Sequence, residues 1–336
     1  MTPAVKELGE FELIRRFFTR SSAQSTETSG VILGIGDDAA LLELPKDVDL
    51  VAAVDTIVEG RHFPPGAPAR SIGHRALAVN LSDLAAMGAT PAWATLALTV
   101  PGVDVNWLQD FSAGLLDLAD EHGVALVGGD TTRGPLTVSI QVLGHVPRGT
   151  ALRRSGARAG DWLVVTGTLG DAGAGLKFVT ASAVGVQHEA ELIRRFEYPT
   201  PRVQFGMAAR GIASAAMDLS DGLVGDLPKL AQASGLAARV AVETLPLSAA
   251  LRTAATAAES RDWALAAGDD YELLLAVPQQ RLEELEGVAA RLNLTLTKIG
   301  KMTAGSGVTW SLNGKDYLPS SSGYDHFGRA STQITV

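Results

Sequence analysis

The chain has 336 residues, of which 46% are hydrophobic and 19% are charged, and its formal net charge is −9. These values suit a globular protein of two domains and argue against nucleic acid and anionic membranes as partners. The sequence contains no cysteine, which excludes disulfides, thiolate metal sites and thiol nucleophiles. It opens without a basic-then-apolar leader and has no apolar run of membrane-spanning length, so we expect a cytoplasmic protein.

The first half of the chain mixes helices with strands. Helices are predicted at residues 10–18, 71–88 and 106–122. Strands are predicted at residues 39–44, 50–55, 92–100, 125–128 and 137–146. The Ser/Thr-rich run at 19–29 and the proline-containing segment at 56–69 are predicted to be loops.

The predicted helix at 71–88 is apolar on nearly every side, which indicates a buried helix. Asp83 nevertheless lies in its middle, with Asn80 one turn earlier on the same face. A buried carboxylate without a partner is costly, so Asp83 is expected either to be hydrogen-bonded or to meet a cation.

The second half begins after a Gly/Arg/Pro-rich stretch at 147–160, so we predict domains at 1–149 and 150–336. Strands are predicted at 162–166, 215–218, 239–242, 272–277 and 295–301. Helices are predicted at 176–180, 189–196, 203–210, 223–234, 248–257 and 280–292. The order lacks a regular βαβ repeat, which predicts a two-domain α+β fold with mixed sheets.

Two common phosphate-binding motifs are rejected. Gly34-x-Gly36-x-x-Ala39 fits the dinucleotide fingerprint only formally, because a strand follows it and Asp37 and Asp38 would repel a bare phosphate. The run at 167–177 resembles a P-loop, but Leu176 separates Gly175 from Lys177.

Aspartates recur at strand ends and tight turns: Asp37, Asp38, Asp55, Asp83, Asp130, Asp218 and Asp221. Strand ends can converge at one edge of a sheet, and converging carboxylates repel unless divalent cations lie between them. Mg²⁺ suits such a set, because it binds oxygen and bridges carboxylates to substrate phosphates. Each aspartate taken singly also fits a turn or cap role.

Other polar residues leave two interpretations open. His62 is either an exposed loop residue or a ligand-binding one, and the pair at 153–154 is either solvated or a phosphate clamp. The acids at 268–273 precede an apolar strand and fit a role in capping and solubilising its start. The aromatic and polar run at 322–327 is either an ordered tail or a lid over a ring-shaped ligand.

Eight ordered blocks carry a family resemblance: GIGDDAA (34–40), VDTIVEGRHF (54–63), ALAVNLSDLAAMGATP (76–91), GGDTTRGP (128–135), LRRSGARAGDWLVVTGTLGDAGAGL (152–176), DLSDGLVGDL (218–227), GDDYEL (268–273) and GYDHF (323–327). Together they resemble thiamine-monophosphate kinases, within the wider aminoimidazole-ribotide-synthetase-like superfamily. The resemblance runs from Glu10 to Phe327, almost the whole chain.

The resemblance implies transfer of the ATP γ-phosphoryl group to thiamine monophosphate, the last step of thiamine diphosphate synthesis. It implies a homodimer formed through the N-terminal, ATP- and Mg-binding domain, and several Mg²⁺ ions. The implied metal ligands are Asp38, Ala53, Val54, Asp55, Asp83, Asp130, Asp218 and Asp221. The implied ATP contacts are Gly129, Asp130, Arg154 and Ser220. The implied thiamine monophosphate contacts are His62, Asp269 and Tyr324.

The chain departs from the family pattern at two places. Ala53 and Val54 stand where the family usually has hydroxyl residues, so only their backbone carbonyls could ligate metal. Asp269 stands where the family often has glutamate. The alternatives are another ATP-using enzyme of the superfamily, such as a purine-synthesis synthetase, or a catalytically silent Mg–nucleotide-binding protein. A resemblance to selenophosphate synthetases or to hydrogenase-maturation proteins would require cysteines, and this sequence contains none.

Overall fold

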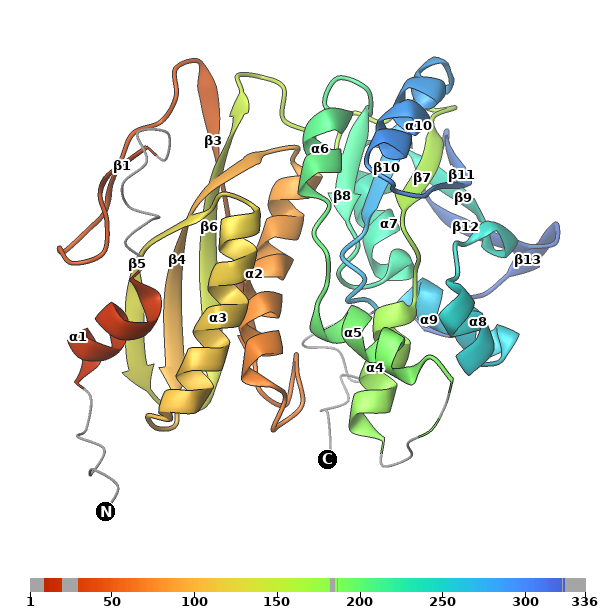
Figure 1. The fold of residues 1–336 in the computed structure, drawn as a ribbon. Helices are drawn as coiled ribbons and strands as arrows, with labels where there is room; N and C mark the ends of the chain where they lie inside the picture. The colour runs from red at the N-terminus through yellow and green to blue at the C-terminus, as the bar shows by residue number, and fades with distance from the viewer. Residues whose placement is uncertain (1–8, 20–29, 182–184, 186, 322, 324–336) are drawn as a thin grey trace. The chain divides into compact units, whose positions relative to one another are not determined.

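The computed structural model describes residues 9–19, 30–181, 185, 187–321 and 323 (Figure 1). Two compact units are formed. Unit 1 contains the described residues up to Asn80 together with Pro91–His145. Unit 2 contains Leu81–Thr90 and the described residues from Val146 onward. The assignment of separate roles to residues 1–149 and 150–336 stays a prediction.

Unit 1 is built on a four-stranded sheet with the order β3-β6-β4-β5. Its strands are β3 (Val48–Val58), β4 (Thr90–Val100), β5 (Ala125–Arg133) and β6 (Thr137–Pro147). β4 and β5 are parallel, which requires a crossover, and α3 (Val105–Glu121) supplies it. Asp104 caps α3, accepting hydrogen bonds from the amides of Asn106 and Trp107.

Most residues of helix α2 (Ala69–Ala86) are buried, as its composition predicts, although Arg70 near its start is exposed. Ala78 and Leu81 have no exposed surface. In unit 1, α2 and α3 lie side by side on one face of the sheet (Figure 1). Two glycines allow the close approach: a Cβ on Gly73 would lie 2.1 Å from the Phe111 carbonyl oxygen, and one on Gly114 would lie 2.0 Å from that of Arg70.

Short elements complete unit 1. They are α1 (Glu10–Leu13), a π-helical turn (Ile14–Phe18) and a two-stranded sheet of β1 (Val31–Leu33) with β2 (Leu41–Leu42). The ring of Phe18 meets that of Phe111 on α3 edge to face, with centroids 6.3 Å apart.

Unit 2 contains a mixed seven-stranded sheet with the order β13-β12-β9-β11-β7-β10-β8. Its strands are β7 (Trp162–Thr166), β8 (Ala215–Asp218), β9 (Ala237–Ala241), β10 (Leu273–Val277), β11 (Leu296–Thr303), β12 (Gly307–Leu312) and β13 (Lys315–Tyr317). Its helices are α4 (Asp171–Thr180), α5 (Glu189–Glu197), α6 (Val203–Ala209), α7 (Leu223–Ala233), α8 (Ala249–Ala254), α9 (Ala257–Ala266) and α10 (Leu282–Arg291). Every residue of β10 is buried.

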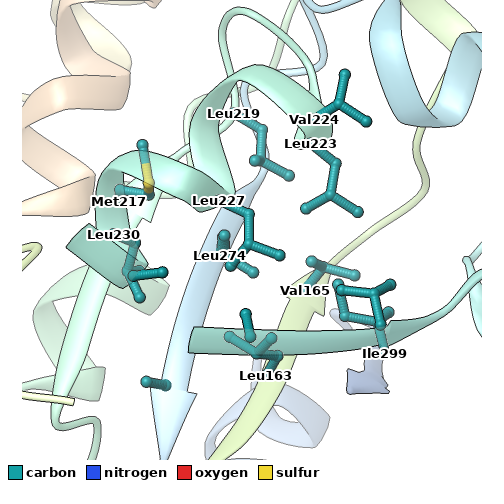
Figure 2. Packing of buried hydrophobic residues seen from close by; sticks show 14 of the residues in the cluster. Leu163, Val165, Met217, Leu219, Leu223, Val224, Leu227, Leu230, Leu274 and Ile299 are labelled. Carbon is teal, nitrogen blue, oxygen red and sulfur yellow. The ribbon is translucent and has the colours of Figure 1, made fainter. Parts of the chain in front are cut away.

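The main core of unit 2 lies between its sheet and α7 (Figure 2). Leu223, Leu227 and Leu230 of α7 face Leu163 and Leu274 of the sheet in the same apolar cluster. Burying a leucine is worth about 1.5–3 kcal/mol, so this layer holds α7 and the turn before it firmly on the sheet.

The α+β class with mixed sheets is confirmed, and most predicted elements are present within one to several residues of their expected ends. The strand expected at 39–44 is only two residues long. The strand expected to end at residue 128 continues through Gly129 to Arg133, because β5 pairs with β4 along that length. The helix expected at 248–257 is instead two helices, α8 and α9. No helix in the described part of the chain is both long and apolar enough to cross a membrane.

Candidate active site

The turn between β8 and α7 gathers three of the predicted site residues. Asp218 ends β8 and is 5% exposed, and its Oδ2 accepts a hydrogen bond from Ser82 Oγ at 2.8 Å. Ser82 directly precedes Asp83 on the part of α2 that belongs to unit 2, where Asp83 is half-buried. Ser220 and Asp221 follow in the same turn. This hydrogen bond joins two segments that are 136 residues apart in the sequence.

The backbone of this turn is held by Asp226, on the first turns of α7. Asp226 Oδ2 accepts the amides of Ser220 at 3.0 Å and Asp221 at 2.9 Å. Lys229 Nζ donates to Asp226 Oδ1 at 2.9 Å and to Asp221 Oδ2 at 2.6 Å. Burial would lower the pKa of Lys229, but its hydrogen bonds to the two carboxylates outweigh burial and raise it. Lys229 therefore stays charged at neutral pH.

A second loop, residues 268–272, is attached to the first. The Asp269 amide donates to the Ser220 carbonyl and the Tyr271 amide donates to the Leu219 carbonyl, both at 2.9 Å. Asp269 and Tyr271 have φ values of 61° and 49°, a conformation that costs energy for residues other than glycine. The Tyr271 hydroxyl lies 3.2 Å from Asp269 Oδ1. Such strain persists only where surrounding contacts enforce it, which is common in ligand-binding loops.

Behind this loop lies an ion network centred on Glu272, which has no exposed surface. Arg202 donates from both Nε and Nη2 to the carboxylate, Arg195 Nη2 donates at 3.0 Å, and Thr166 Oγ1 donates at 2.7 Å. Burial would raise the pKa of Glu272, but Arg202 and Arg195 outweigh it and hold that pKa below its ordinary value. A Cβ at position 167 would lie 2.1 Å from Glu272 Oε1, so glycine is required there.

The P-loop-like run at 167–177 does form a strand, a glycine turn and a helix. However, its helix N-terminus is already occupied, because the Gly170 amide donates to Asp270 Oδ2 at 2.8 Å and Asp171 lies in the first turn. Burial raises the pKa of Asp270 well above its ordinary range. The Asp270 side chain occupies a backbone amide that a P-loop would offer to phosphate, which agrees with the rejection of this motif.

In unit 1, Asp55 lies on β3 and is exposed, and its amide donates to Asn80 Oδ1 at 2.9 Å. Asn80 has no exposed surface and its Nδ2 donates to the Ala76 carbonyl, so its role is to link α2 to β3. Ala53 is half-buried and Val54 is 62% exposed. Asp38 is exposed in the segment between β1 and β2.

Gly129 and Asp130 are exposed residues inside β5. The backbone at Gly129 has φ 149°, and a Cβ there would lie 1.9 Å from the Leu96 carbonyl oxygen. Only glycine permits this pairing of β5 with β4, so the position is fixed by local geometry whatever ligand it meets.

His62 is half-buried rather than freely exposed, and its Nδ1 accepts the Val58 amide at 3.0 Å. A neutral His62 ring therefore carries its proton on Nε2. Arg154 is exposed, and its carbonyl accepts a hydrogen bond from Ser234. Tyr324 lies outside the described residues.

Within the residues that the structure describes, no group of three or more metal-binding side chains is gathered. In unit 2, however, Asp218, Ser220, Asp221 and Asp269 lie on two loops that hydrogen-bond to each other. The joint metal-binding role of all the predicted ligands stays a prediction.

Sequence reasoning missed the residues that support these loops: Asp226, Lys229, Glu272, Arg195 and Arg202. One signal was present, because Asp226 and Lys229 are three residues apart in a predicted helix and so lie on one face. Nothing in the sequence indicated the Glu272 network, whose partners are 70 and 77 residues away.

The fold and these loops define an AIR synthase related protein. The N-terminal domain family of that name matches residues 36–146, and its C-terminal domain family matches residues 158–312. A thiamine-monophosphate kinase from Salmonella typhimurium is 47% identical over 325 residues, which cover 95% of this chain and 98% of the relative. The chain belongs to the thiamine-monophosphate kinase family.

Two solved structures are similar over nearly the full length. The thiamine-monophosphate kinase from Stenotrophomonas maltophilia K279a has a TM-score of 0.84 at 45% identity, covering 92% of this chain and 98% of that one. AaThiL, complexed with AMPPCP and TMP, has a TM-score of 0.75 at 32% identity, covering 95% of this chain and 97% of that one.

Proposed function

We propose that this protein transfers the γ-phosphoryl group of ATP to thiamine monophosphate, forming thiamine diphosphate and ADP. The observation that carries the proposal is the similarity to AaThiL, whose structure holds AMPPCP and TMP together and is matched over 95% of this chain. Two relatives of higher identity are named thiamine-monophosphate kinase, and this name states the same activity.

We propose that Asp38, Asp55 and Asp130 in unit 1 are Mg²⁺ ligands, and that Asp83, Asp218 and Asp221 in unit 2 are Mg²⁺ ligands as well. These side chains suit Mg²⁺, because each would offer it a carboxylate oxygen as ligand. Three of the six side chains are exposed. Ala53 and Val54 would contribute backbone carbonyls. When bound, Mg²⁺ neutralises phosphate charge and stabilises the charge of the transferring group.

The protein's own groups position the two substrates. We assign ATP binding to Gly129, Asp130, Arg154 and Ser220. Ser220 is well suited, because its amide is fixed by Asp226 and its carbonyl by the Asp269 amide, so the side chain is presented from a rigid turn.

We assign thiamine monophosphate binding to His62, Asp269 and Tyr324. Asp269 is held in its strained conformation by the 219–220 backbone, and its carboxylate suits the cationic ring system of thiamine. Tyr324 would supply an aromatic face to the thiazolium, an attraction of roughly 0.5–2 kcal/mol.

Transfer needs no strong general base. The acceptor phosphate has a second pKa of about 6, so its oxygen is already ionised at neutral pH. We therefore propose direct in-line transfer. Rapid acid quenching of a reaction with ATP labelled in its γ-phosphate should trap no labelled protein; a phosphoaspartate that forms and decays at the turnover rate would contradict this step.

A coupled assay of ADP release tests the proposed function. With ATP and Mg²⁺, ADP should form when thiamine monophosphate is added and not when thiamine is added, because thiamine lacks the acceptor phosphate. Equal ADP release without either acceptor would indicate an ATPase, and no release under any condition would indicate a silent binding protein.

We further propose that the protein is a homodimer formed through unit 1. β3 is an outer strand of its sheet, and Leu50 and Val54 on one face of β3 are 51% and 62% exposed. An outer strand with exposed apolar residues is normally covered by a partner.

Light scattering tests the dimer. The wild-type protein should have twice the mass of one chain, and the Leu50→Lys variant should have the mass of a single chain. Leu318→Lys, at a leucine 90% exposed in unit 2, should stay dimeric; a wild-type monomer would refute the dimer.

A further inference from the structure

The turn at 218–222 depends on a carboxylate that has no role in the proposed chemistry. The side chain of Asp226 is 1% exposed. One of its oxygens accepts the amides of both Ser220 and Asp221, and the other accepts Lys229 Nζ. All of its hydrogen bonds hold the turn or Lys229.

Lys229 connects this buried carboxylate with an outer one. Its ammonium lies 2.9 Å from Asp226 Oδ1 and 2.6 Å from Asp221 Oδ2. The Asp221 side chain is 30% exposed and that of Lys229 is 42% exposed, so the contact lies at the edge of the site. Asp226 and Lys229 are three residues apart on α7, which the leucine layer fixes to the sheet (Figure 2).

We propose that Lys229 is a positioning residue: its ammonium is a built-in counter-ion that holds the 218–222 turn, and with it Ser220 and Asp221, in the conformation that receives the Mg-bound nucleotide. The nucleotide part rests on the proposed function, whereas the positioning of the turn does not.

Charge repulsion is the physical reason. Asp221 and Asp226 are both drawn to one ammonium, so in its absence two carboxylates would face each other in a partly buried place. Asp226 cannot move away without losing two backbone hydrogen bonds. Asp221 is the more exposed of the two. We therefore expect its side chain to rotate toward solvent and to displace the backbone of the turn.

The direct test measures the turn in the free enzyme by hydrogen exchange and mass spectrometry. The variant is Lys229→Met, which keeps the helix-compatible stem and removes the charge. Lys229→Arg restores the charge. Lys177→Met is the matched control, because Lys177 is also a half-exposed helical lysine with a carboxylate partner, at 3.4 Å from Glu259.

Peptides that contain the Ser220 and Asp221 amides should exchange at least tenfold faster in Lys229→Met than in the wild type. Lys229→Arg and Lys177→Met should differ from the wild type by less than about threefold. Peptides from β10 should be unchanged in all variants, which verifies the fold. Unchanged exchange of the turn in Lys229→Met would overturn the proposal.

The nucleotide part is tested by calorimetric titration with Mg²⁺ and AMPPCP, which does not require turnover. The Kd should rise at least tenfold in Lys229→Met and less than threefold in Lys229→Arg. Faster exchange of the turn with an unchanged Kd would refute the role in nucleotide binding. If the wild type lacks ADP release with thiamine monophosphate, the proposed function fails, and the exchange and binding data still decide the role of Lys229.

Discussion

Replacing Glu272 by glutamine is expected to lower the free energy of unfolding of unit 2 by about 3–5 kcal/mol, the usual cost of breaking a buried ion pair on one side. Glu272 accepts hydrogen bonds from Arg202, Arg195 and Thr166 on its two oxygens. A glutamine amide group would turn an N–H toward these donors. Two arginines would then be left partly buried with less negative charge to compensate them.

Urea unfolding followed by circular dichroism measures this loss. Glu284→Gln is the control, because Glu284 pairs with Arg281 on the surface of α10 and its side chain is 52% exposed. That variant should leave the unfolding midpoint unchanged, since exposed pairs contribute little. A loss of less than 1 kcal/mol for Glu272→Gln would show that the network contributes little to stability.

The same network predicts an acid dependence. The folded protein holds the pKa of Glu272 below its ordinary value, so its contribution is present above the unfolded-state pKa and is lost as pH falls through the lower folded-state pKa. The difference in stability between wild type and Glu272→Gln should therefore shrink as pH falls from about 5 toward 3. A difference that stays constant over this range would contradict the shift.

Replacing Asp83 by asparagine is expected to lower kcat by a factor of about 10² to 10³ or more, the range seen when a group that stabilises transition-state charge is removed. Asparagine has nearly the same shape, so the buried helix α2 should keep its fold. Asp83 directly follows Ser82, which is hydrogen-bonded to Asp218. The expected loss of activity rests on the proposed role of Asp83 as a metal ligand.

Asp117→Asn on α3, whose side chain is 52% exposed, is the control and should retain full activity. Manganese binding, followed by electron paramagnetic resonance in the presence of AMPPCP, should weaken in Asp83→Asn and not in Asp117→Asn. Normal turnover with normal magnesium dependence in Asp83→Asn would show that Asp83 is a structural residue.

The elements around the turn in unit 2 were predictable because local signals agreed with tertiary structure. The apolar run at 215–217 followed by Asp218 and a glycine turn predicts a strand that ends at a turn, and leucines at helical spacing predict α7. Helix α2 was predictable for a similar reason, since few surfaces other than a core accept so apolar a helix.

Other elements were missed although signals were present. Asn313 and Gly314 have φ values of 52° and 75°, the conformation of the hairpin turn that an Asn-Gly pair predicts, and they join β12 to β13. Thr256 and Glu259 form a capping box that starts α9. In β5 the reason is different, because pairing with β4 overrides the low strand propensity of Gly128 and Gly129.

The support of the site was not predictable from sequence alone. From the sequence alone, each of Arg195, Arg202 and Glu272 would be assigned to the protein surface. Only the fold brings them into one buried network. Asp226 similarly reads as an ordinary helix residue until its hydrogen bonds to the preceding turn are seen.

The most direct measurement follows the transferred group itself by ³¹P NMR. The enzyme is supplied with thiamine monophosphate and with ATP whose γ-phosphoryl oxygens carry ¹⁸O. We expect thiamine diphosphate with the isotope shift on its terminal phosphorus and none on the inner phosphorus, formed together with ADP. Labelled inorganic phosphate with no thiamine diphosphate, or a label on the inner phosphorus, would contradict it.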